Sequence, residues 1–203
     1  MTEQSSVHAY LNWAKERIDE MDAALASLEA KAAQMTDDSK ADADQLTADL
    51  KKQRGEFQAA IKKQVEAGET VWQRTKPQLE SQWNTFEARV KTYIDTVAKQ
   101  IPEQQAIFDE VAKAQMKSWR EAADTIGETA TRFAAGRRAE IDAAVKQMKV
   151  DASEAETRLR KLKQTGNESW AALSAALAES RKAFDRANQA ACDAVKRTAP
   201  PPA

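Results

Sequence analysis

The sequence has little of what compact β folds require. Its 203 residues include five glycines and five prolines, and three of the prolines stand among the last four residues. So few turn-forming residues are incompatible with the many short connections of a sheet protein. The single cysteine, Cys192, excludes an intrachain disulfide and favours a reducing compartment. We therefore expect an all-α, cytoplasmic protein.

Catalytic and metal-binding patterns are also missing. The one histidine, His8, lies close to the N-terminus, so a Ser/His/Asp or Cys/His arrangement has no well-placed base. The glycines are too far apart for a phosphate-binding loop, and the Glu-x-x-His spacing of di-metal helical bundles does not occur. Carboxylates alternate with lysine and arginine, as on solvated helix faces. We expect no enzyme activity, no cofactor and no metal site.

Charge and hydropathy exclude two further classes of protein. The net charge of -1 and a pI of about 6.0 argue against binding to nucleic acid. No apolar run approaches the roughly 18 residues of a membrane-spanning helix, and the first residues lack the pattern of a signal peptide. One dense basic group remains: Arg158, Arg160, Lys161 and Lys163. These cations either contact an anionic surface or complement the negative end of a helix dipole.

Alanine, glutamate, lysine, leucine and arginine supply about half of the chain, a composition typical of long helices and coiled coils. Helices should end and begin at the polar residues 36–39, at Pro102 and at residues 165–167. Pro77 should kink a helix without reversing it, because the helical spacing of apolar residues continues across it. We predict one elongated antiparallel bundle or coiled coil over residues 1–198, with about four helices in the order short, long, long, short. The predicted ranges are 4–35, 39–100, 103–164 and 167–197, followed by a disordered Pro-rich tail, 199–203.

Apolar residues recur at steps of three and four along these ranges, and many of them are alanine. If the two long helices reverse at Pro102, both short helices cover one half of the hairpin and leave residues 70–135 bare. The aromatic residues expected to act there as contact anchors are Trp72, Trp83, Phe86, Trp119 and Phe133. This arrangement predicts a scaffold that forms a homodimer or binds a protein partner through the 70–135 region. Alternatively, these rings pack inside their own bundle.

Charge is distributed unevenly along the chain. The first 50 residues are strongly acidic, whereas residues 51–100 are basic. We therefore expect the acidic first helix to lie against basic flanks of its neighbours. The exposed ion pairs between them should determine the orientation of the helices more than they stabilise the fold.

A tryptophan is followed 14 residues later by a phenylalanine three times, in the pairs Trp72 and Phe86, Trp119 and Phe133, and Trp170 and Phe184. This spacing suggests duplication of a helical unit of about 50 residues. It also arises without duplication, since aromatic residues on any long apolar face fall at multiples of about 3.5.

The C-terminal segment SWAALSAALAESRKAFDRANQAACDAVKR resembles the ends of small bacterial coiled-coil proteins, a resemblance that implies no particular activity. The Pro-punctuated amphipathic helices, with tryptophan and balanced charge, also look like those of exchangeable apolipoproteins and of the phasins that coat storage-polymer granules. That second resemblance implies a protein that coats a lipid or granule surface, as the alternative to a scaffold.

Overall fold

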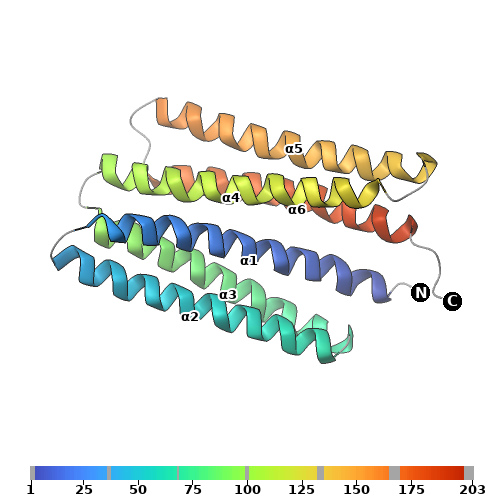
Figure 1. Cartoon of the computed structure of the whole chain (residues 1–203), viewed down its shortest axis with the longest axis horizontal. Coiled ribbons are helices and arrows are strands. Elements are labelled where there is room, and N and C mark those ends of the chain that lie inside the picture. Colours follow the sequence, from blue (N-terminus) through green and yellow to red (C-terminus); the bar gives the residue numbers. More distant parts are fainter. Residues whose placement is uncertain are drawn as a thin grey trace. The chain divides into compact units, whose positions relative to one another are not determined.

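The computed structural model describes residues 3–35, 38–67, 69–98, 101–131, 135–164 and 170–198 (Figure 1). Within these ranges the chain forms six helices and no strand, which confirms the all-α class. Each helix has 29 to 31 residues, a length of about 45 Å. The bounds are α1 Glu3–Ala33, α2 Asp38–Ala67, α3 Glu69–Val97, α4 Ile101–Ala130, α5 Ala135–Gln164 and α6 Trp170–Thr198.

The prediction of four helices, short, long, long and short, is wrong. Each predicted long helix is two helices: α2 and α3 occupy 39–100, and α4 and α5 occupy 103–164. The first unforeseen break separates α2, which ends at Ala67, from α3, which begins at Glu69. The sequence has a glycine between them, and glycine is the poorest helix former after proline. At the end of α4, the backbone N–H and the hydroxyl of Thr131 both donate to the Glu128 carbonyl, at 3.2 and 2.7 Å. Such a tight last turn is typical of a helix C-terminus.

The other helix boundaries lie close to the predicted ones. The breaks near residue 36, before Pro102 and near residue 166 separate helices as expected. Pro77 lies inside α3, which continues to Val97, so the chain does not reverse there. The tail 199–203 and the side chains of His8 and Cys192 lie outside the described residues.

Residues 17–115 form one compact unit, in which α2 packs against α3. Arg54 of α2 binds Asp22 of α1 at 2.7 Å, and Lys51 pairs with Glu29 about two turns further along α1. Residue numbers rise on α2 as they fall on α1, so these two helices are antiparallel. In both pairs a cation of α2 meets a carboxylate of the acidic first helix, although α2 as a whole has as many acidic as basic residues. The fully buried apolar side chains of this unit include Met21, Leu28, Leu50, Phe57, Leu79, Phe86 and Tyr93.

The second compact unit contains residues 1–16 and 116–203. Its helices α5 and α6 pack against each other. Lys149 of α5 pairs with Asp124 of α4 at 2.6 Å, and Arg120 of α4 pairs with Glu156 of α5. These two pairs make α4 and α5 antiparallel. The fully buried side chains of this unit include Trp119, Ala123, Ile141, Met148, Ala152 and Phe184.

The helices α1 to α3 and α4 to α6 repeat one pattern at an interval of 98 residues. Trp72 and Trp170, and Phe86 and Phe184, are separated by this interval. Burial follows it as well. The residues of the first half that are buried, and whose equivalents are buried too, include Ala14, Arg17, Glu20, Met21, Leu25, Ala32, Ala43, Thr47, Leu50, Phe57, Leu79, Trp83, Phe86 and Tyr93.

One ion pair repeats at the same interval. Lys40 pairs with Asp44 within α2, and the equivalent residues Arg138 and Asp142 pair within α5. The pattern indicates a duplicated three-helix unit of about 98 residues, twice the period that the tryptophan–phenylalanine spacing suggested.

Candidate functional site: buried rings and charged surfaces

Three of the five predicted contact anchors are core residues of their own compact units. Trp83 is 5% exposed, and Phe86 and Trp119 are fully buried. Trp83 stacks on Phe86 with ring centroids 5.9 Å apart, and the Arg17 guanidinium lies 5.2 Å from the Trp83 ring. Trp119 stacks on Phe184 at 5.1 Å. These rings stabilise contacts between helices, as the alternative interpretation of the sequence held.

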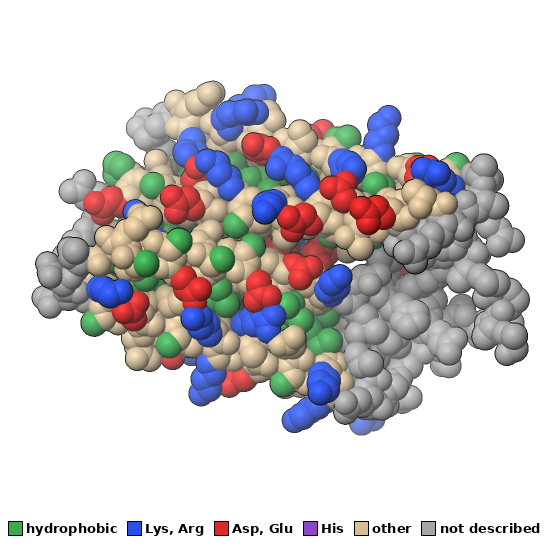
Figure 2. Space-filling model, in the orientation of Figure 1, with side chains coloured by type: hydrophobic (Ala, Val, Ile, Leu, Met, Phe, Trp, Pro, Cys, Tyr) green, Lys and Arg blue, Asp and Glu red, His purple; other side chains and the backbone are tan. Residues whose placement is uncertain are grey.

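The side chains of Trp72 and Phe133 lie outside the described residues. Among the side chains that are described, Val150 is the one large apolar residue that is exposed, at 38%. Figure 2 shows acidic and basic side chains interspersed over the visible face. The described surface therefore offers no aromatic patch for a partner.

Polar and charged side chains share the buried helix faces with the rings. Arg17 and Glu20 are 1% and 0% exposed and form an ion pair at 2.7 Å. The Asn188 amide donates to the Glu16 carboxylate at 2.7 Å. Burying charges costs hydration free energy that pairing only partly offsets. The buried polar residues are Glu16, Arg17, Glu20, Thr47, Gln64, Gln115, Ser118, Ser180, Arg181 and Asn188.

The sequence analysis missed this polar component of the core, although the sequence carries a signal for it. Arg17 and Glu20 stand three and six residues after the buried Ala14 and precede the buried Met21 and Ala24, so they occupy the apolar face of α1. A charged residue at such a position is a candidate buried ion-pair partner.

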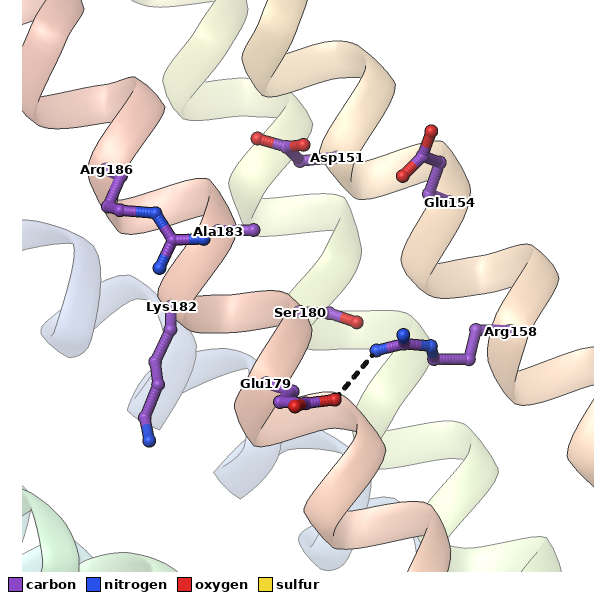
Figure 3. Close-up of a pocket in the computed structure, with 8 residues that line it drawn as sticks. All are labelled: Asp151, Glu154, Arg158, Glu179, Ser180, Lys182, Ala183 and Arg186. Carbon is purple, nitrogen blue, oxygen red and sulfur yellow. Dashed lines mark hydrogen bonds and ion pairs between the residues drawn. The ribbon is translucent and has the colours of Figure 1, made fainter.

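A groove of about 440 Å³ lies between α5 and α6 (Figure 3). Arg158 reaches from α5 to Glu179 of α6, with Nη1 3.1 Å from Oε2. The α5 side also carries Asp151 and Glu154, whereas the α6 side carries Lys182 and Arg186. Glu154, Lys182 and Arg186 form no hydrogen bond or ion pair with any residue in the described ranges. The groove can thus bind charged groups of either sign.

The predicted basic group lies at the C-terminal end of α5, and all four of its side chains are exposed. The charge of Arg158 is compensated by Glu179, and Arg160 donates to the Thr157 hydroxyl at 3.3 Å. Lys161 lines a second groove of about 420 Å³, and Lys163 lies in the last turn of the helix. A position at the helix end is compatible with both interpretations of the group, dipole complementation and contact with an anionic surface.

The described residues also bear on metal sites and membrane-spanning helices. Within the described ranges, no three histidine, cysteine, aspartate or glutamate side chains are arranged to hold a metal ion. None of the helices, as far as it is described, combines the length and the apolarity needed to cross a membrane. No family model, curated protein or solved structure matches this chain.

Proposed function

We propose that this chain is a non-enzymatic amphipathic-helix protein that coats an apolar surface in water, such as a lipid or storage-granule surface. It does so by exchanging contacts between its helices for contacts with that surface. The observation that carries the proposal is the inward placement of the aromatic rings on helices whose outer faces are charged. Trp83, Phe86, Trp119 and Phe184 are the rings concerned.

The free energy available from these faces is substantial. A buried aromatic side chain removes about 150–250 Å² from water, which corresponds to several kcal/mol for each ring. Among the six helices, α4 and α6 separate their polar and apolar faces most sharply, and they carry Trp119 and Phe184. A helix of this kind binds flat at an interface, with its apolar face at headgroup depth.

The composition of the core supports reversible separation of the helices. Alanine supplies much of the buried surface, and alanine stabilises a contact less than leucine or isoleucine does. The Arg17–Glu20 pair regains hydration when the helices part. The free energy that keeps the helices together is therefore smaller than in a fully apolar core of the same size.

The direct test is binding of the full chain to vesicles of phosphatidylcholine and phosphatidylglycerol, and to phospholipid-coated triolein droplets. We expect co-sedimentation or flotation with the lipid, and quenching of tryptophan emission by brominated acyl chains. A Phe184→Ala variant should bind more weakly, because it loses an inward-facing ring, whereas the control Val150→Ala should bind normally. A wild-type chain that binds neither kind of particle would reject the proposal.

A second candidate is a scaffold that binds itself or a protein partner. The α5/α6 groove favours it, since carboxylates on one helix and cations on the other suit a charged partner. A homodimer through residues 70–135 stays a prediction, for which the described side chains offer no exposed ring. Light scattering at micromolar concentration tests self-association. A monomer at every concentration would leave only a different partner for this candidate.

A further inference from the structure

Both repeats carry a pair of adjacent cations near the end of their second helix. The pairs are Lys62–Lys63 in α2 and Arg160–Lys161 in α5, at equivalent positions 98 residues apart. All four side chains are exposed. Each pair is followed by a tryptophan ten positions after its first cation, at 72 and at 170. We call Lys62–Lys63 and Arg160–Lys161 the two basic doublets.

In both repeats the doublet lacks an acidic partner within the described ranges. Among the described residues, Lys62, Lys63 and Lys161 form no hydrogen bond or ion pair, and Arg160 donates only to the Thr157 hydroxyl. Lys51 and Lys149, which are also equivalent in the two repeats, both pair with a carboxylate on the preceding helix. The repeated unit thus neutralises one pair of equivalent cations and leaves the doublets in water.

Complementation of the helix dipole accounts for only one of the four cations, because Lys161 lies in the last turn of α5 whereas Lys62, Lys63 and Arg160 lie outside the last turns of their helices. The favourable effect of a cation at a helix C-terminus falls off within the last turn. The last turn of α2 contains no basic residue, so Lys62 and Lys63 lie outside it. Two adjacent exposed cations without counter-charges are instead suited to the phosphates of an anionic surface.

We propose that the two basic doublets are the contacts by which this chain docks on an anionic phospholipid surface, one doublet from each repeat. This inference rests on the proposed function and specifies the surface that the protein coats. Each doublet is an electrostatic contact that raises the local concentration of the amphipathic helices of its own repeat at the lipid. The attraction is independent of helix separation and precedes it.

The test compares two full-length variants with the same change in net charge. The first replaces the doublets, with Lys62→Gln, Lys63→Gln, Arg160→Gln and Lys161→Gln. The control replaces four other exposed cations that have no partner among the described residues, with Lys15→Gln, Lys52→Gln, Lys146→Gln and Lys182→Gln. On vesicles of phosphatidylcholine and phosphatidylserine, we expect the doublet variant to lose about 100-fold in partition coefficient. The control should lose less than about tenfold.

Three outcomes would overturn the inference. Equal losses in the two variants would assign binding to net charge, and binding to pure phosphatidylcholine as strong as to the anionic vesicles would remove any role for the doublets. In both cases the coating function would stand. Displacement of the wild-type chain from vesicles by millimolar inorganic phosphate, at constant ionic strength, would identify a site for the free anion. A wild-type chain that binds neither vesicles nor the triolein droplets rejects the proposed function itself.

Discussion

The Arg17–Glu20 pair combines two roles on one face of α1. Arg17 neutralises the buried Glu20 carboxylate at 2.7 Å and also lies over the Trp83 ring at 5.2 Å. A guanidinium suits this position because it is planar, weakly hydrated and permanently charged. Arg17 thus links the buried carboxylate of α1 to a ring of α3, while the cost of burying both charges offsets much of their attraction.

This balance predicts a non-additive pair of substitutions. Arg17→Met leaves the Glu20 carboxylate buried without this counter-charge and should lower the free energy of unfolding by about 3–5 kcal/mol. The double variant Arg17→Met, Glu20→Leu removes both charges and should recover most of that loss, or exceed the wild type. Urea unfolding followed by far-UV circular dichroism measures both values. A double variant as unstable as Arg17→Met would show that the ion pair is not the source of the effect.

Trp119 is the largest fully buried side chain of the described residues and stacks on Phe184. Trp119→Ala should lower the free energy of unfolding by about 3–5 kcal/mol, through lost burial and the cavity left behind. Chemical denaturation gives this value, with Val150→Ala as a control that should change it by less than about 0.5 kcal/mol because Val150 is exposed. A loss below 1 kcal/mol for Trp119→Ala would contradict the core role of this ring.

Because of Tyr93, the stability of the folded protein should depend on pH in the alkaline range. Its hydroxyl donates to the Leu28 carbonyl at 3.1 Å, and burial, with a smaller effect of the Asp44 charge, raises the pKa of Tyr93 to about 12. The neutral phenol is thus favoured in the folded state, so its contribution is complete below pH 10 and is lost as the pH rises from 10 to about 12. Tyr93→Phe should be about 1 kcal/mol less stable at neutral pH. The difference should shrink above pH 10 in denaturation curves measured at each pH, and a constant difference would contradict the shift.

At the scale of the element, two glycines lie inside helices without a packing reason. A Cβ at Gly55 in α2 would meet no atom within 4 Å, and one at Gly127 in α4 would lie 3.5 Å from Val145 Cγ1, an ordinary van der Waals contact. Gly55→Ala and Gly127→Ala should therefore each stabilise the chain by about 1 kcal/mol. The two effects should add, because the residues belong to different compact units. Thermal unfolding of the single and double variants checks both statements, and a destabilised variant would contradict the open space at its glycine.

Helix boundaries were predictable where the local chemistry of a few residues decides them. Proline at 102 cannot donate a backbone hydrogen bond, and Thr36, Asp37, Asp38 and Ser39 are N-cap residue types, so both breaks follow from short segments. A glycine such as Gly68 destabilises a helix by only about 1 kcal/mol relative to alanine. Tertiary packing therefore decides whether a helix continues through it. Local reasoning could not decide that case, and the long-helix layout failed there.

The error in layout carried over into the candidate site. The expectation of bare aromatic rings over 70–135 depended on two long helices that extend beyond two short ones. With six helices of nearly equal length, Trp83, Phe86 and Trp119 each find neighbours within a compact unit and are buried. The sequence showed that these residues are large and aromatic. It did not show whether they are exposed, because exposure depends on the arrangement of all helices.

At the scale of the whole molecule, the two repeats place different residues at equivalent positions of the core. Position 21 of the first repeat holds methionine and its equivalent 119 holds tryptophan, whereas position 83 holds tryptophan and its equivalent 181 holds arginine. All four side chains are buried. At these two positions each repeat thus buries one tryptophan, contributed by the third helix in one repeat and by the first helix in the other.

Stacked aromatic rings can show whether the helices separate on a surface. Trp119 of α4 stacks on Phe184 of α6, so this pair gives a near-UV circular dichroism signal that depends on contact between helices, whereas Trp83 and Phe86 stack within α3. If the coating proposal holds, adding anionic vesicles should abolish most of this signal while the far-UV helical signal is retained. The helices keep their backbone hydrogen bonds at an interface and lose only their contacts with each other. A Trp119→Phe variant identifies the part of the signal that comes from this ring. A near-UV signal that persists in lipid-bound protein would mean that the bundle docks closed, through its charged surface alone, and would contradict the exchange of helix contacts.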